Sequence, residues 1–212
     1  MTDPAVAPDP GVAKAKNILR SHVRAERARF PLPDASRAAR LARALRCCSG
    51  SRVVALYASV PPAPDTLGLA DALAAAGVRV LLPKLAGFRT PRWAWYSGPA
   101  SLVSGWRGIP EPEGPALPAE SLAEADLIWC SALAADASGR RVGTGGGWYD
   151  RALAHRSRGA TVGVLLNDRE VRDAVPADAW DVPVHLIVTE QRAIRCPGVE
   201  AAATQDPPSG GD

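Results

Sequence analysis

The 212-residue sequence predicts one α/β domain with a mainly parallel central sheet and helices on both of its faces. Short β-branched apolar runs alternate with segments of helical periodicity, an order typical of parallel strands joined by helices. The length suits a single well-buried domain. A glycine-rich loop follows one of the apolar runs, and open α/β sheets bind their ligands beyond the carboxyl ends of strands.

The elements are expected in the following order. Helical patterns cover 14–29 and 34–46, and Asp34 can cap the second one. Asp65 or Thr66 caps a third helix that runs to Ala76 and is stopped by Gly77, and a fourth covers 148–158. Apolar runs predict strands at 52–58, 78–82, 92–96, 125–130, 160–166 and 184–189. Residues 105–118 hold four prolines and three glycines, which predicts an irregular loop.

The composition sets limits on the class of protein. Residues 1–12 and 197–212 are expected to be disordered tails around a domain at 13–196. The first residues lack the apolar core of a signal peptide, and no apolar run reaches the roughly 18 residues of a membrane span. The four cysteines show no Cys-x-x-Cys spacing, so we expect a cytoplasmic protein without disulfides or zinc. A net charge of +3 is too small to indicate a nucleic-acid partner.

The loop at 139–151 is the strongest functional signal. It holds four glycines in five residues, at 143 and 145–147, directly before a helical pattern. Such a loop leaves backbone N–H groups free to converge on an anion at a helix N-terminus. A tight turn alone needs only one or two glycines. Arg140, Arg141 and Arg151 flank the loop and can bind phosphate oxygens.

Carboxylates near this loop suggest a metal ion. Asp150 would repel a bound phosphate unless a divalent ion lay between them, and Mg²⁺ takes one or two carboxylates together with phosphate oxygens. The loop therefore predicts a site for a metal-bound polyphosphate. Asp168 follows the strand at 160–166 and is a candidate second metal ligand; the alternative is an exposed helix cap at Asn167 or Asp168. Asp136 is expected to be a turn residue.

A row of cations lies on the first predicted helix. Lys16, Arg20 and Arg24 are spaced four residues apart and share one helix face. The row is either a solvated surface or part of a polyanion site.

Taken in order, these motifs resemble the 5-formyltetrahydrofolate cyclo-ligase family over about residues 14–195. The resemblance rests on Lys16-x-x-Leu19-Arg20, Asp65-Thr66, the segment at 105–112, the glycine loop through Asp150-Arg151, and Asp181-Val182-Pro183 with Thr189-Glu190. It implies a three-layer α/β/α fold.

The resemblance also implies an activity. It is the ATP- and Mg²⁺-dependent cyclisation of 5-formyltetrahydrofolate to 5,10-methenyltetrahydrofolate, with release of ADP and phosphate, by a monomer with small-molecule partners only. Asp150 and Asp168 would hold Mg²⁺, and Thr144 to Trp148 would border the pterin, with the Trp148 ring available for stacking. Lys16, Arg141 and Arg151 would be catalytic, and the ATP phosphates would be bound by Lys16, Arg20, Arg141, Gly143, Thr144, Gly145, Gly146, Gly147, Trp148 and Tyr149.

Three positions depart from the family pattern. Ala63 stands where family members commonly carry a folate-contacting Glu. Asn167-Asp168-Arg169-Glu170 replaces an aromatic-Asp-x-Gln motif, and Trp148 replaces a Tyr. Two other functions therefore stay open: a homologue with another substrate or a non-catalytic folate role, and a nucleotide- or nucleic-acid-binding module that uses the basic row.

Overall fold

The computed structural model describes residues 9–86 and 89–197; the expected tail segments 1–8 and 198–212 lie outside the described residues. The first helix, α1 (Pro10–Arg29), begins inside the segment 1–12 that was predicted to be a disordered tail, so this prediction is wrong for residues 10–12. The side chain of Asp9 caps it by accepting hydrogen bonds from the backbone N–H groups of Gly11 at 2.7 Å and Val12 at 3.4 Å. An Asp cap followed by Pro at the first helical position is a strong start signal, which the prediction missed.

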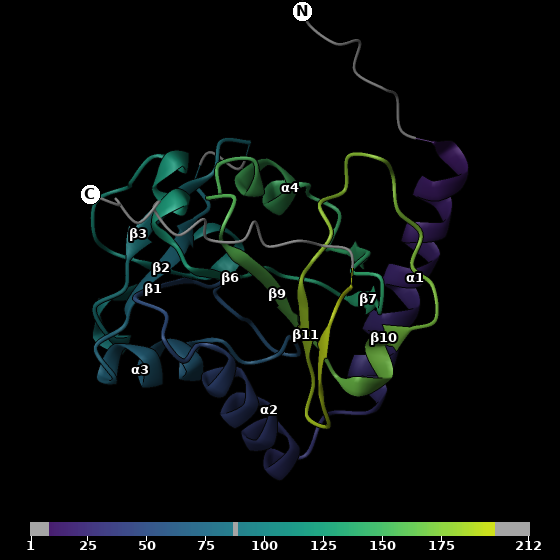
Figure 1. The fold of residues 1–212 in the computed structure, drawn as a ribbon, viewed down its shortest axis with the longest axis horizontal. Coiled ribbons are helices and arrows are strands. Elements are labelled where there is room, and N and C mark those ends of the chain that lie inside the picture. Colours follow the sequence, from purple (N-terminus) through teal and green to yellow (C-terminus); the bar gives the residue numbers. More distant parts are fainter. Residues whose placement is uncertain (1–8, 87–88, 198–212) are drawn as a thin grey trace, which may run out of the picture.

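A seven-stranded sheet in the order β12-β11-β9-β6-β1-β2-β3 forms the centre of the molecule (Figure 1). Its five inner strands are parallel, and the two edge strands run antiparallel to their neighbours. This confirms the mainly parallel sheet. The strands are β1 (Val53–Ala55), β2 (Arg79–Lys84), β3 (Arg92–Trp95), β6 (Leu127–Trp129), β9 (Thr161–Leu165), β11 (Leu186–Val188) and β12 (Ala193–Arg195).

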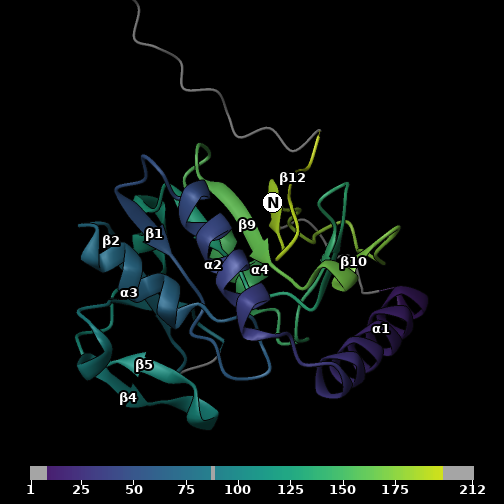
Figure 2. The ribbon, with the colours of Figure 1, turned by 90° about the horizontal axis from the view of Figure 1, so that it is seen from below.

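Helices cover both faces of this sheet, as predicted (Figures 1 and 2). Helices α2 (Asp34–Cys47) and α3 (Leu67–Ala75) bury one face, where Leu56, Leu69 and Trp129 form a fully buried cluster. Helix α4 (Trp148–Leu153) and the 3₁₀ segment Ala119–Glu124 bury the other. The fold is a three-layer α/β/α domain. No helix within the described ranges is long and apolar enough to span a membrane.

Helix ends differ from the predictions in two places, at the start of α2 and the end of α4, and at the start of α3 the structure shows which of two candidates supplies the capping side chain. Asp34 is the first residue of α2, and Pro33 is its cap. Of the two candidates before α3, Asp65 supplies the capping carboxylate, which accepts from Leu67 N at 3.0 Å. The helix predicted at 148–158 ends at Leu153, because the chain then turns through i→i+3 hydrogen bonds toward β9.

Two small sheets were missed. β7 (Ala134–Asp136), β8 (Arg141–Val142) and β10 (Val171–Arg172) form one of them, so a hairpin separates β6 from the glycine loop. β4 (Leu102–Ser104) pairs with β5 (Pro110–Pro112), inside the segment predicted as irregular. Glu111, on β5, is buried and accepts a hydrogen bond from Leu85 N at 2.9 Å, which fixes this segment to the end of β2.

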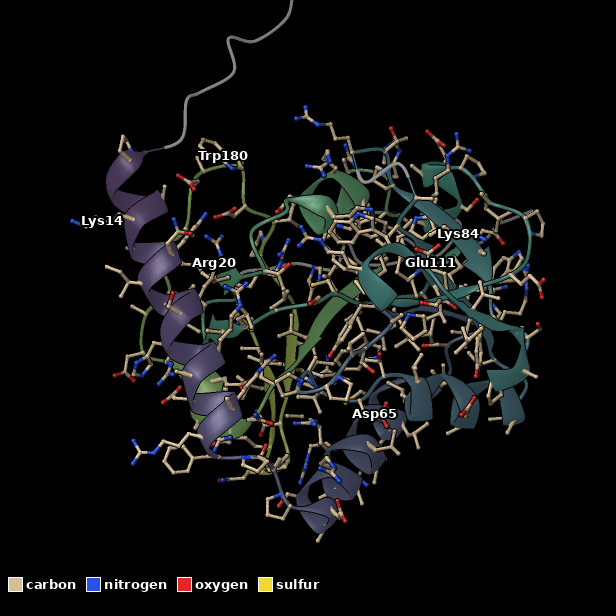
Figure 3. The ribbon with its side chains drawn as sticks, turned by 180° about the vertical axis from the view of Figure 1, so that it is seen from behind. Lys14, Arg20, Asp65, Lys84, Glu111 and Trp180 are labelled. Carbon is tan, nitrogen blue, oxygen red and sulfur yellow. The ribbon has the colours of Figure 1, made fainter. Side chains whose placement is uncertain are left out.

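Helix α1 lies outside the three layers, beside the small sheet that contains β7 and β10 (Figures 1 and 2). Val23 is fully buried against Leu133, Ala134, Val142 and Val175. The side chain of Arg20 points from α1 toward the domain, whereas Lys14 points away (Figure 3).

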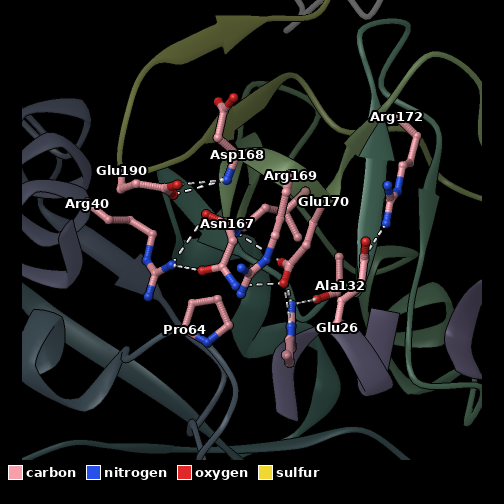
Figure 4. A network of polar contacts seen from close by, with 12 residues as sticks. Glu26, Arg40, Pro64, Ala132, Asn167, Asp168, Arg169, Glu170, Arg172 and Glu190 are labelled. Carbon is pink, nitrogen blue, oxygen red and sulfur yellow. Dashed lines mark hydrogen bonds and ion pairs between the residues drawn. The ribbon is translucent and has the colours of Figure 1, made fainter. Parts of the chain in front are cut away.

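A buried ion pair fixes the C-terminal half of α1 to the domain (Figure 4). Arg27 Nε and Nη2 donate to Glu170 Oε1 and Oε2, each at 2.7 Å, and both side chains are at most 5% exposed. Asn167 donates its backbone N–H and its side-chain amide to the same carboxylate, at 3.0 and 2.7 Å. Arg40, on α2, donates to Asn167 Oδ1 at 2.6 Å. The network therefore links α1, the end of β9 and α2.

We expect Arg27→Met to lower the free energy of unfolding by about 3–5 kcal/mol, because it leaves the Glu170 carboxylate buried without its cation. The double variant Arg27→Met/Glu170→Met should recover much of this loss, since it removes both charges. Urea unfolding of the three proteins measures the difference. Glu124→Gln, which breaks an exposed ion pair with Arg79 on the same domain, is the control and should cost less than about 1 kcal/mol. If Arg27→Met lowered the free energy of unfolding as little as the control does, the buried Arg27–Glu170 pair would not be what attaches α1 to the domain.

Candidate functional site

A cavity of about 290 Å³ lies between α1, the glycine loop and the segment 178–181. The volume is at the lower end of the range for small-molecule sites. It is lined by Ala13, Lys16, Asn17, Arg20, Ser131, Arg141, Val142, Gly143, Thr144, Gly145, Gly146, Gly147, Trp148, Tyr149, Asp150, Asp178, Trp180 and Asp181.

The glycine loop needs its glycines. Gly145 and Gly147 have φ values of 106° and 61°, which favour glycine, and a Cβ on Gly147 would lie 3.0 Å from Arg151 Nη1. Among the residues that the structure describes, none accepts a hydrogen bond from the backbone N–H groups of 144–147. These donors remain available to a ligand. The α4 helix behind them has only six residues, so the donors rather than a long helix dipole supply the attraction.

Arginines hold the loop from outside. Arg20 Nε donates to Gly143 O at 2.9 Å, and Arg24 Nη2 donates to Thr144 O at 3.1 Å. Arg20 and Arg24 are therefore engaged with the loop backbone, although the Arg24 side chain is exposed. Arg151 donates to Gly146 O at 3.2 Å and does not line the cavity, so its contact with this site is through the loop backbone.

Lys16 reaches two carboxylates that the sequence places far away. Its Nζ donates to Asp178 Oδ2 at 2.6 Å and to Asp181 Oδ2, and Lys16 is only 7% exposed. Burial disfavours the ammonium charge, but the hydrogen bonds and charges of the two aspartates outweigh it and raise the Lys16 pKa. Lys16 therefore stays protonated at neutral pH.

Arg141 occupies the floor of the cavity. It is buried and forms an ion pair with Asp150. Its Nε is buried and has no hydrogen-bond partner among the described residues, an arrangement that costs free energy unless a ligand supplies an acceptor.

The structure brings most of the predicted residues together in this cavity, with the exception of Arg24, Arg140, Arg151 and Asp168. Asp168 does not line the cavity. Its carboxylate accepts from Thr189 Oγ1 and Arg192 Nε, both at 2.9 Å, and its backbone N–H donates to Glu190 (Figure 4). The predicted helix cap at this position is Asn167.

Two acidic residues were missed as site residues. Asp178 and Asp181 line the cavity opposite Arg141 and Asp150, and both contact Lys16. Asp181 belongs to the Asp-Val-Pro motif of the resemblance, which was the available signal. Its contact with a lysine 165 residues away could not be derived from the sequence.

The aromatic part of the prediction needs correction. Trp148 is 6% exposed and packs edge-on against Trp93 and Tyr149, with ring centroids 5.1 and 4.9 Å away. Its ring is part of the core and has little free face for stacking on a pterin. Ala63 is half-buried and does not line this cavity.

The charges of the cavity fit a polyphosphate with a divalent ion. Lys16, Arg20 and Arg141 supply three cations, and Asp150, Asp178 and Asp181 supply three carboxylates. No cluster of three or more His, Cys, Asp or Glu within the described ranges could hold a metal ion by itself. A divalent ion would therefore need oxygens from a bound phosphate as further ligands, as Mg²⁺ commonly has.

Comparison with known proteins gives one family. Residues 12–190 match the model of the 5-formyltetrahydrofolate cyclo-ligase family. The 5-formyltetrahydrofolate cyclo-ligase of Mycolicibacterium smegmatis is 41% identical over 148 residues, 68% of this chain and 76% of the relative. The enzyme of the same name from Escherichia coli K12 is 30% identical over 145 residues, 67% of this chain and 80% of the relative.

Solved structures agree with the sequence relatives. The 5,10-methenyltetrahydrofolate synthetase of Aquifex aeolicus superposes with a TM-score of 0.70 and 28% identity, covering 86% of this chain and 93% of its own. The synthetase of Mycoplasma pneumoniae, at 18% identity and a TM-score of 0.65 over 82% and 98% of the two chains, shows the same fold. Because the matched region spans every element around the cavity, from α1 to the segment with Asp181, the chain belongs to the 5-formyltetrahydrofolate cyclo-ligase family.

Proposed function

We propose that this protein uses ATP and Mg²⁺ to cyclise 5-formyltetrahydrofolate to 5,10-methenyltetrahydrofolate, releasing ADP and phosphate. The observation that carries the proposal is the cavity in which Lys16, Arg20 and Arg141 converge on a glycine loop with open N–H donors. The names of the curated relatives supply the substrate.

The proposed reaction needs phosphate activation because a formamide oxygen is a poor leaving group. The formyl oxygen attacks the γ-phosphorus of ATP, the bond to the bridging oxygen breaks, and ADP leaves. N10 of the same folate then attacks the activated carbon, loses its proton, and inorganic phosphate leaves with the former formyl oxygen. The protein mainly aligns the two substrates and neutralises the charge that develops on the transferred phosphoryl group.

The residues around the cavity suit this task. The loop N–H groups at 144–147 and the buried Arg141 provide donors for phosphate oxygens. Lys16 and Arg20 add charge from α1. In this role Arg141 is a catalytic residue, and Arg151 supports the loop through Gly146 O.

For Mg²⁺ we assign Asp150 and Asp181, since both line the cavity and Asp168 does not. The ion would neutralise the phosphates and orient the γ-phosphoryl group. When Asp181 serves as a metal ligand, Lys16 loses one of its two carboxylate partners and becomes available to a phosphate oxygen. The residues of the unliganded site would thus exchange partners when the nucleotide binds.

The direct test is the absorbance of methenyltetrahydrofolate after mixing the protein with 5-formyltetrahydrofolate, Mg²⁺ and ATP. We expect an increase that requires ATP and disappears with EDTA. No increase, from protein that binds Mg²⁺–ATP, would refute the proposed activity.

A homologue with another substrate is the second candidate, and Ala63 is the observation that favours it. The position lies in the Pro61–Pro64 turn beside Tyr57, whose hydroxyl donates to Pro64 O at 3.0 Å. A carboxylate missing from this turn removes one polar contact that family members commonly make with the folate.

A nucleic-acid module has less support, because the basic row on α1 is engaged with the loop and the aspartates.

We expect Asp150→Asn and Asp181→Asn each to lower kcat by about a hundredfold or more, since loss of even outer-sphere metal partners costs 10- to 100-fold. Excess Mg²⁺ or Mn²⁺ should restore part of the activity. Asp168→Asn is the matched control and should keep its kcat within about threefold, because that carboxylate contacts Thr189 and Arg192. If Asp168→Asn were inactive and Asp181→Asn active, Asp168 and not Asp181 would be the second Mg²⁺ ligand.

Lys16→Ala should raise the KM for ATP by about 10- to 100-fold and change the KM for the folate much less, given the usual strength of charged hydrogen bonds. Steady-state kinetics with each substrate varied in turn measures both values. Lys14→Ala, on the outer side of α1, should leave both KM values unchanged (Figure 3). An unaltered KM for ATP in Lys16→Ala would remove this lysine from the nucleotide site.

Ala63→Glu should lower the KM for 5-formyltetrahydrofolate by about tenfold, because it restores a charged contact with the folate, and should not change the KM for ATP. Ala63→Gln introduces a side chain of the same size as Glu without the charge, so it shows whether charge or shape changes the KM for the folate. A higher folate KM in Ala63→Glu would favour the altered-substrate candidate.

A further inference from the structure

Trp180 is a large aromatic residue on the rim of the cavity, and the function described so far gives it no role. It is 43% exposed, whereas Trp93 and Trp129 are fully buried. Single exposed apolar residues are common on proteins. Trp180 differs because its exposed ring lines a cavity together with Lys16 and Arg20.

The turn that carries Trp180 is held in place. Asp178 N donates to Asp181 Oδ2 at 2.8 Å, and Asp181 N donates to Asp178 O at 3.1 Å. Lys16 binds both carboxylates from α1. The indole therefore stands on a turn that is fixed on both of its sides, which lowers the entropy cost of stacking a ligand on it.

Helix α1 gives the order of groups along the cavity. Arg20 and Arg24 contact the glycine loop, and Lys16, one turn earlier, contacts the turn that bears Trp180. Ala13, which also lines the cavity, lies about 10 Å along the helix from Arg20. Arg20 and Trp180 both lie on the inner side of α1 (Figure 3). One end of the cavity is thus formed by Arg20 and the backbone donors of the glycine loop, and the other by the turn that carries the indole and is bound by Lys16.

A nucleoside triphosphate has the same polarity, with a polyanion at one end and a flat aromatic base at the other. Bases stack well on tryptophan, and a purine offers a larger ring than a pyrimidine. Asn17 also lines the cavity, and its Oδ1 accepts from Arg20 Nη1 at 2.6 Å.

We propose that Trp180 is the base-binding residue of the nucleotide site: it stacks on the purine of the nucleoside triphosphate and makes purine nucleotides preferred over pyrimidine nucleotides. This inference rests on the proposed function for the identity of the nucleotide, and it adds the part of the site that selects the base.

The test is direct binding, with Mg²⁺ present, of ATP, CTP and inorganic tripolyphosphate to the whole protein and its variants. Trp180→Ala should weaken ATP binding by about 10- to 100-fold, reduce the preference for ATP over CTP, and leave tripolyphosphate binding unchanged. Trp180→Phe should keep most of the affinity for ATP. Trp106→Ala, which removes an exposed indole outside the cavity, should have no effect on ATP binding.

Two results would overturn the proposal. Unchanged ATP binding in Trp180→Ala would show that the base lies elsewhere, and an equal loss for ATP and tripolyphosphate would show that Trp180 only shapes the phosphate end. The measurement is independent of turnover. Wild-type protein that binds ATP but does not cyclise the folate would refute the proposed function and still decide the role of Trp180, whereas protein that does not bind ATP would refute both.

Discussion

The site depends on how α1 is attached to the domain. This helix belongs to neither of the layers that cover the central sheet, yet it supplies Lys16 and Arg20 to the cavity. Its buried face meets the domain through Arg27 and Glu170 at one end, Val23 in the middle, and Lys16 at the other end. Because an α-helix is stiff, the buried ion pair at Arg27 also fixes the positions of Arg20 and Lys16, about 10 and 16 Å away along the helix axis. A bidentate pair suits this purpose, since it specifies orientation as well as distance.

Much of the fold could be predicted from the sequence because its signals are local. Apolar runs located the inner strands to within a few residues, and the glycine loop was placed before a helix that does form. The hairpin of β7 and β8 was missed because its strands have three and two residues, too few for a periodic pattern. The start of α1 was missed although a local signal, Asp9-Pro10, was present.

The site was predicted less completely, because several of its contacts join residues that are far apart in the sequence. The glycine loop, Arg141 and Asp150 lie close together in the sequence and were found together. The second carboxylate was assigned to Asp168 because that residue follows a strand. The folded chain directs Asp168 toward Arg192, and the turn after β10 brings Asp181 to Lys16. The Asp-Val-Pro motif marked Asp181 only through the resemblance, and the path of the chain shows which of the two aspartates lines the cavity.

Under the proposed function, the charges of the cavity also give a reason why its carboxylates and cations are paired before a nucleotide binds. Unpaired, buried Lys16 and Arg141 would each incur a large desolvation cost, and the aspartates remove much of it. A metal-bound polyphosphate offers the same groups an equivalent set of partners: the ion for Asp150 and Asp181, and phosphate oxygens for the lysine and the arginine. Binding of the metal-bound polyphosphate then exchanges ion pairs instead of creating them. A polyphosphate without the ion would instead be repelled by the three carboxylates of the cavity. The paired site therefore favours the metal-bound nucleotide over the free one.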